Sequence, residues 1–102
     1  MRIYISGPIT GTSDYMDRFA AAEAKLTSGG YVCVNPARVN AELPQDTTHE
    51  EYMRTSICMM NMCEAVYVLD GWQNSAGCAE EITTAVRREM MIIFENGKAG
   101  LA

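Results

Sequence analysis

Short apolar runs alternate with amphipathic segments along this sequence, and this alternation constrains the fold more than any other feature. The apolar runs are rich in β-branched and aromatic residues and predict strands over residues 2–6, 31–34, 65–70 and 90–94. Apolar side chains at helical spacing predict helices over residues 15–27, 48–63 and 77–88, with a polar loop up to about residue 47. Such alternation with short connections is typical of an α/β fold with a parallel sheet and right-handed crossovers.

The length of 102 residues predicts a single domain spanning residues 1–102. Hydrophobic residues make up 48% and charged residues 21%, as in an ordinary soluble domain. No apolar run approaches the roughly 18 to 20 residues of a membrane span. The first residues lead into a strand without the basic and apolar segments of a secretory signal. We therefore expect no membrane association and a cytoplasmic location, which is the host cytoplasm if a phage encodes the protein.

The charged residues and the cysteines argue against two further classes of protein, namely nucleic-acid-binding proteins and zinc proteins. A formal net charge of -5, with eight scattered Lys and Arg residues, argues against a nucleic-acid polymer as partner. The cysteines Cys33, Cys58, Cys63 and Cys78 have no C-x-x-C spacing and only one histidine beside them. This pattern favours reduced, mostly buried thiols over a zinc site.

Three loops leave the expected strands at their carboxyl ends, where parallel α/β sheets bind their ligands. They cover residues 7–11, 35–36 and 70–77. In the first loop, within "SGPITG", two glycines remove Cβ atoms where a ligand or a helix can pass closely, and turn amides can receive a phosphate or a sugar hydroxyl. Because neither G-x-G-x-x-G nor G-K-[ST] is present, an ordinary strand-to-helix turn is the alternative.

The stretch "NSAGCAEE" places a hydroxyl, a glycine and two carboxylates where the last helix begins. Glu80 and Glu81 point about 100° apart on a helix, so only one of them can face the crevice above the sheet. One interpretation makes that glutamate a nucleophile or base. The alternative is that both acids only complement the helix dipole.

Several motifs occur in order over nearly the whole chain: "IYISGPITG", "VNPA", "EYMR", "VYVLDGW" and the S-x-G-x-x-x-E spacing of Ser75, Gly77 and Glu81. With these motifs the chain resembles the small phage and bacterial proteins of the nucleoside 2-deoxyribosyltransferase-like superfamily, in a branch of unknown function. The resemblance implies a flavodoxin-like or Rossmann-like three-layer fold, with a mainly parallel sheet of four or five strands and a sugar site at its carboxyl edge.

The resemblance also implies roles for individual residues. Glu81 attacks C1′ of a nucleoside or nucleoside 5′-monophosphate, Tyr4 hydrogen-bonds this nucleophile, and Ser75 lies against the sugar or its phosphate. The reaction passes through an oxocarbenium-like state, which an ionised carboxylate stabilises and traps as a glycosyl ester. We expect Glu81 to be ionised at neutral pH because the helix N-terminus favours its charge. The remaining candidates for substrate binding are Ser6, Gly7, Pro8, Ile9, Thr10, Gly11, Asn35, Pro36, Asp70, Trp72 and Gly77.

Some of these residues have equally good structural interpretations. Trp72 can stack on a base or cover the sheet edge, and Asn35 and Pro36 can shape a base pocket or simply end a strand. Outside this set, Arg54 can reach a phosphate or form a surface ion pair, and His49 is interpreted as a solvated residue.

One position departs from the family pattern and leaves the function open. The family's Tyr-Met-Arg is commonly followed, after one residue, by an aspartate that contacts the catalytic centre, and Ser56 stands there. A hydroxyl does not supply the charge of a carboxylate. The first hypothesis is an N-glycoside hydrolase or deoxyribosyltransferase. The second is an inactive protein that sequesters a nucleotide or nucleotide-derived signal, and the third is a structural or partner-binding role.

The implied chemistry needs no metal and no organic cofactor. The expected partner is a small-molecule nucleoside or nucleotide. Members of the superfamily often complete their sites across a subunit interface, so the resemblance also implies a homodimer or a larger homo-oligomer.

Overall fold

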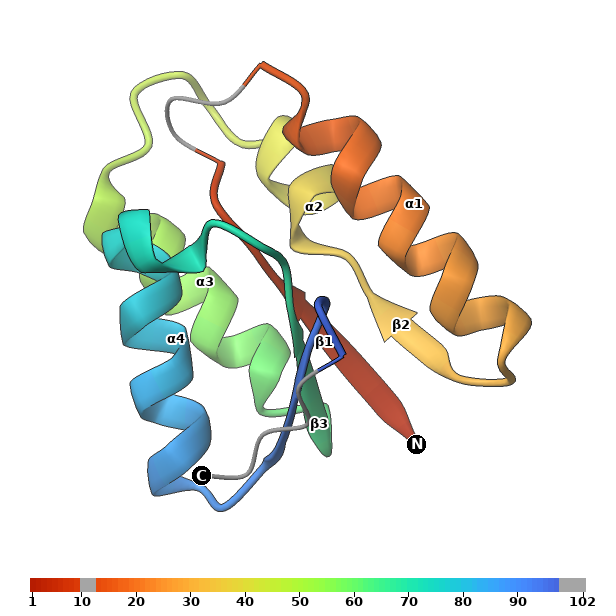
Figure 1. Ribbon diagram of the computed structural model, residues 1–102. Coiled ribbons are helices and arrows are strands. Elements are labelled where there is room, and N and C mark those ends of the chain that lie inside the picture. Colours follow the sequence, from red (N-terminus) through yellow and green to blue (C-terminus); the bar gives the residue numbers. More distant parts are fainter. Residues whose placement is uncertain (10–12, 98–102) are drawn as a thin grey trace.

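Strands and helices alternate in the computed structural model, which describes residues 1–9 and 13–97 (Figure 1). Its elements, in chain order, are β1 (Arg2–Ser6), α1 (Tyr15–Ser28), β2 (Val32–Val34), α2 (Pro36–Ala41), α3 (His49–Met60), β3 (Ala65–Val68), the 3-10 helix η1 (Trp72–Asn74), α4 (Ala76–Arg87) and β4 (Met91–Phe94). The four expected strands and three expected helices are all present.

The described strands form one parallel sheet in the order β2-β1-β3-β4. In register, Ile3 of β1 lies opposite Cys33 of β2 and Ala65 of β3. The chain steps from β1 to β2 on one side and then crosses to β3 on the other, so the strand order reverses at β1. Loops that leave such a reversal diverge and open a crevice at the carboxyl edge. The expected α/β fold of the flavodoxin-like or Rossmann-like three-layer type is therefore confirmed.

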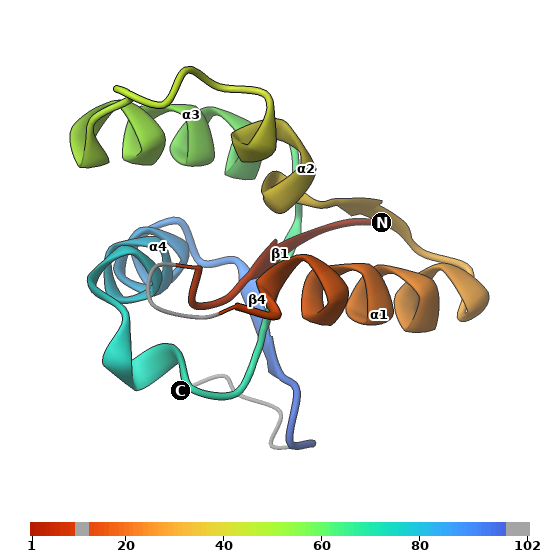
Figure 2. The ribbon, with the colours of Figure 1, turned by 90° about the horizontal axis from the view of Figure 1, so that it is seen from above.

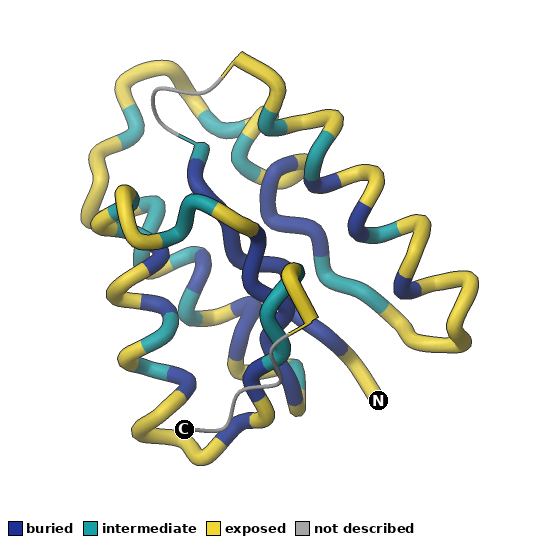
Figure 3. The backbone as a smooth tube through the Cα atoms, viewed as in Figure 1, coloured by how far each residue is buried: buried dark blue, intermediate teal, exposed yellow. Residues whose placement is uncertain are grey.

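Alternate side chains of β1 serve two hydrophobic cores, one on each face of the sheet. Ile3 and Ile5 pack in the core that contains Phe19 of α1. Tyr4 packs in the core that contains Met60 of α3 and Ala85 of α4. Seen from above, α1 lies on one side of the sheet and α3 and α4 lie on the other (Figure 2). Buried residues follow the strands and the inward sides of the helices (Figure 3).

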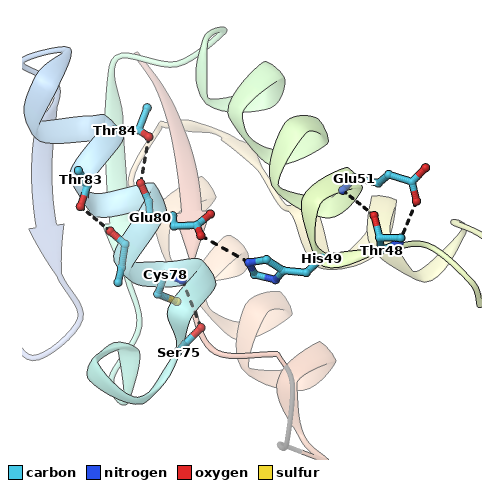
Figure 4. A network of polar contacts seen from close by, with 9 residues as sticks. Thr48, His49, Glu51, Ser75, Cys78, Glu80, Thr83 and Thr84 are labelled. Carbon is cyan, nitrogen blue, oxygen red and sulfur yellow. Dashed lines mark hydrogen bonds and ion pairs between the residues drawn. The ribbon is translucent and has the colours of Figure 1, made fainter.

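Side-chain caps fix where α3 and α4 begin. The amide of Glu51 donates to Thr48 Oγ1 at 3.1 Å, and the Thr48 amide donates to Glu51 Oε1 at 2.8 Å, a reciprocal capping box (Figure 4). At the start of α4, the amide of Cys78 donates to Ser75 Oγ at 3.2 Å. The two caps place both helix N-termini at the carboxyl edge of the sheet.

Helix α2 corrects the expected polar loop after β2. Asn35 is its N-cap, because its Oδ1 accepts a hydrogen bond from the Ala37 amide at 3.0 Å. Pro36 occupies the first helical position, where its missing N–H costs nothing. The segment contains too few apolar residues for a helical period to show, so the Asn-Pro pair was its main signal.

Other boundaries differ by one to three residues. Strand β3 ends at Val68, and Gly71 then adopts φ +88° in the turn into η1. Helix α3 ends at Met60, and α4 begins at Ala76 rather than at Gly77. Among the described residues, no helix is both long enough and apolar enough to cross a membrane.

Candidate functional site

A cavity of about 470 Å³ opens at the carboxyl edge of the sheet, on the side of α3 and α4. Strand β1 and the residues after it form its floor, and side chains from the starts of α1, α3 and α4 and from α2 form its walls. This volume lies in the range of small-molecule sites. The cavity therefore occupies the place where the strand order leads one to expect a ligand.

Glu81 lies at the base of this cavity, with only 7% of its surface exposed. The Tyr4 hydroxyl donates to Glu81 Oε2 at 2.6 Å, and the Ser6 hydroxyl donates to Oε1 at 2.5 Å. Ser56 of α3 lines the same cavity and is buried, and its hydroxyl also favours the charged form of this carboxylate. Tyr4 and Ser6 are two residues apart on β1 and so point to the same face of the sheet, which α4 covers. The hydrogen bond expected between Tyr4 and Glu81 is present.

The surroundings of Glu81 control its protonation. Burial raises the pKa of Glu81 above its ordinary value of 4.5, and the hydrogen bonds from Ser6, Tyr4 and Ser56 offset part of that rise. This direction is opposite to the one that the helix terminus alone favours. Burial, with the Glu81 charge adding to it, raises the pKa of Tyr4 well above its ordinary value of 10.0. The Tyr4 hydroxyl therefore stays protonated at neutral pH and remains a donor.

Glu80 points away from the base of the cavity on α4. Its side chain is exposed, and Oε1 lies 3.6 Å from His49 Nε2 at the start of α3 (Figure 4). His49 lines the cavity, so this contact joins α3 and α4 at the cavity wall. As expected from the helical geometry, only one of the two adjacent glutamates faces the crevice.

Half of the sequence-predicted site residues come together here. Besides Glu81, the cavity is lined by Tyr4, Gly7, Ile9, Pro36, Ser75 and Gly77. Ser6 lies directly behind the carboxylate that it hydrogen-bonds. These residues come from three different parts of the chain, and the sheet edge joins them.

Other predicted residues lie outside the lining. Asn35 caps α2 and donates to Glu23 at 3.1 Å. Asp70 is exposed, and its carbonyl oxygen accepts a hydrogen bond from Arg18 at 2.7 Å. The Trp72 ring lies 5.7 Å from that of Phe94, which matches its interpretation as a sheet-edge cover. Pro8 also does not line the cavity, and Thr10 and Gly11 fall outside the described residues.

Gly7 has a packing reason to be glycine. A Cβ atom at this position would lie 2.6 Å from Leu69 Cδ1 and 3.0 Å from Leu69 Cβ, which is closer than real Cβ contacts allow. The turn after β1 therefore needs a glycine to pass Leu69 at the end of β3, and this need does not depend on a ligand in the cavity. The ordinary-turn interpretation of "SGPITG" accounts for Gly7.

Several residues that line the cavity were not among the candidates for substrate binding that the sequence indicated. They are Tyr15, Asn40, His49, Tyr52, Met53, Ser56, Asn74 and Ala76. Asn40 comes from the helix that was expected to be a loop. Ser56 follows Tyr52 by four residues and Met53 by three on α3, and these two spacings are the signal that predicts a face shared by Ser56 with each of them. Arg54 lies outside this lining and is 4.0 Å from Glu50 in an exposed ion pair.

Within residues 1–9 and 13–97, no group of three His, Cys, Asp or Glu side chains is placed to hold a metal ion. Glu81 is also the single acidic side chain among the described residues that line the cavity. Its neighbours there are hydroxyl, amide and aromatic groups. The site therefore offers one carboxylate among neutral hydrogen-bonding groups.

The fold and the site together define a class: a parallel, flavodoxin-like α/β domain with one buried carboxylate facing a cavity at the strand-order reversal. Over residues 1–94 the chain matches the family described as a domain of unknown function, DUF4406. The chain therefore belongs to the DUF4406 family. No curated protein sequence matches it.

Proposed function

We propose that this protein binds a nucleoside or nucleoside 5′-monophosphate in the cavity and cleaves its N-glycosidic bond, with Glu81 as the nucleophile. The observation that carries the proposal is the buried Glu81 carboxylate, which two hydroxyls of β1 hold in the base of a ligand-sized cavity. The motif resemblance to the nucleoside 2-deoxyribosyltransferase-like superfamily supports the choice of ligand.

The proposed reaction needs few groups. An oxygen of ionised Glu81 attacks C1′, the bond between C1′ and the base nitrogen breaks, and its electron pair leaves with the base, which takes a proton from solvent. Tyr4 and Ser6 orient the carboxylate for this attack. Water then attacks C1′ of the glycosyl ester, releasing the sugar and regenerating Glu81, whereas a second base in place of water would give a new nucleoside.

A second candidate is a binding protein without turnover. It is favoured by Ser56, a buried hydroxyl beside Glu81 at the position where the superfamily commonly has an aspartate. With one acidic side chain in the described lining, departure of the base has no second carboxylic acid to assist it. Such a protein would bind the same ligand and retain it unchanged.

Chromatography of the free base distinguishes the two candidates. The wild type is incubated with ribo- and deoxyribonucleosides and their 5′-monophosphates, beside Glu81→Gln and the exposed neighbour variant Glu80→Gln. Base release by the wild type and Glu80→Gln, but not by Glu81→Gln, supports the enzyme. Binding without base release for every compound supports the binding protein instead, and Ser56→Asp then tests whether a restored carboxylate brings turnover.

A further inference from the structure

The amide of Asn40 is a polar feature of the cavity that the proposed chemistry does not use. Asn40 lies on α2 and lines the cavity, to which α4 contributes Glu81. Its Oδ1 is the one buried side-chain nitrogen or oxygen among the described residues that has no hydrogen-bond partner. A buried acceptor without a donor costs free energy, so a ligand that supplied the donor would recover that cost.

Several other polar groups at the cavity already have partners. Tyr4 and Ser6 donate to Glu81, Ser75 accepts from the Cys78 amide, and His49 pairs with Glu80. No such bond holds the Asn40 oxygen in place. The terminal torsion of an asparagine side chain is broad, so this amide can turn toward a ligand without breaking a hydrogen bond to its oxygen.

Aromatic side chains accompany this amide. Tyr15 at the start of α1 and Tyr52 of α3 line the same cavity, and both are partly buried. Aromatic rings stack on nucleobases, and asparagine amides pair with base edges that present an amino group beside an acceptor. The chemistry of this part of the cavity therefore suits the heterocycle of a ligand whose sugar lies against Glu81.

We propose that Asn40 determines ligand specificity by accepting a hydrogen bond from the exocyclic amino group of the ligand's base. This inference rests on the proposed nucleoside site and deepens it, since it selects amino-bearing bases over those that lack the group. The specificity would come from Asn40 as a binding residue. It requires no part in bond cleavage.

Paired nucleosides that differ by one amino group test this inference. Calorimetric titration compares adenosine with purine riboside, cytidine with pyrimidin-2-one riboside, and guanosine with inosine. In at least one pair, the wild type should bind the amino-bearing member about tenfold or more tightly than its partner. Asn40→Leu should reduce that preference to about twofold or less, whereas Asn40→Asp, which retains an acceptor, should keep it.

The matched control is Gln45→Leu, which removes an exposed amide from the loop after α2. This variant should prefer the amino-bearing nucleoside of each pair as strongly as the wild type does. The outcomes separate the two proposals. Equal binding within every pair by the wild type, or an unchanged preference in folded Asn40→Leu, overturns the role of Asn40 and leaves the nucleoside site standing. No binding of the six nucleosides, of their 2′-deoxy forms or of their 5′-monophosphates overturns the proposed site and, with it, the inference about Asn40.

Discussion

Glu81 is a carboxylate buried among neutral donors. Tyr4 and Ser6 hydrogen-bond it, and Ser56 lies in the same cavity, but these hydroxyls bring no positive charge, so part of the cost of desolvating its charged form remains. A structural residue at this position would be more favourable as an amide or an apolar side chain. Retaining a carboxylate here at the expense of stability is the pattern of a functional site.

This cost predicts how stability changes with pH. The pKa of Glu81 is raised above 4.5 in the folded protein, so the unfolded chain releases this proton first as the pH rises. The contribution of Glu81 to the free energy of unfolding is thus fully present below about pH 4.5 and is lost as the pH rises through the folded-state pKa.

Glu81→Gln removes this titration while its amide can still hydrogen-bond the surrounding hydroxyls. Urea unfolding from pH 4 to pH 8 should therefore show the variant gaining stability relative to the wild type as the pH increases. Glu80→Gln, which alters the exposed neighbouring carboxylate, should show no such gain in stability with pH. A constant difference between wild type and Glu81→Gln across this range would contradict a raised pKa.

Asn40 and Tyr52 show why part of the site was not predictable from the sequence. Asn40 belongs to no local chemical pattern, and the "EYMR" motif that contains Tyr52 does not indicate where its helix packs. Both residues reach the cavity because α2 and α3 pack above the end of β1. Glu81, Ser75 and Gly77 were predictable because they share one short stretch after a central strand. Residues that converge only through tertiary structure carry no comparable local signal.

At the scale of the helices, side-chain caps indicate where a helix begins more sharply than the spacing of apolar residues does. The Thr48 and Glu51 box that begins α3 is a local signal that the sequence carries, since both partners lie within four residues of each other. The six-residue α2 was missed, because one and a half turns show no period and depend on the Asn35 cap and on packing of Ala37 in the core. Short capped helices are therefore the elements that this reasoning misses most easily.

The start of α4 yields a prediction in which stability and binding change in opposite directions. A Cβ atom on Gly77 would lie 3.5 Å from Met53 Sδ and 3.9 Å from His49 Cε1, which are ordinary contacts. Gly77→Ala should thus raise the free energy of unfolding, by up to about 1 kcal/mol, because alanine favours a helix. The added methyl narrows the cavity between α4 and α3, so affinity for a bound nucleoside should fall.

Thermal unfolding and calorimetric titration of the same Gly77→Ala sample measure both effects. A stabilised variant with unchanged nucleoside affinity would mean that the ligand does not pass against Gly77. The site would then be confined to the part of the cavity nearer β1 and α2.

At the scale of the whole molecule, the alternation of strands and helices was enough to predict the layers, the parallel sheet and the position of the crevice. Right-handed crossovers and the reversal at β1 then place the loops after β1 and β3 at one edge. The contacts that close this edge were not predictable, because they join residues far apart in sequence. Arg18 is the main example.

Arg18 of α1 connects the ends of two strands. Its guanidinium donates a hydrogen bond to the Asp70 carbonyl oxygen at 2.7 Å and lies 3.6 Å from Glu95 Oε1. The same Glu95 oxygen accepts a hydrogen bond from the Asp70 amide at 2.8 Å. Arg18→Ala should lower the free energy of unfolding by about 1 kcal/mol, measured in urea. Arg54→Ala removes an exposed pair within one helix and should have a smaller effect. Equal effects would show that the Arg18 contacts add nothing beyond a surface charge.

The central claim is that Glu81 forms a glycosyl ester, and intact-mass spectrometry of acid-quenched protein tests it most directly. The protein is incubated with 2′-deoxy-2′-fluoro analogues of the nucleosides and nucleotides in the base-release panel, because the fluorine slows hydrolysis of such esters. We predict that the wild type and Glu80→Gln gain the mass of one fluorosugar, that peptide mapping assigns it to Glu81, and that Glu81→Gln gains none. An adduct on another residue, or release of the natural base with no adduct from any analogue, would contradict the role of Glu81.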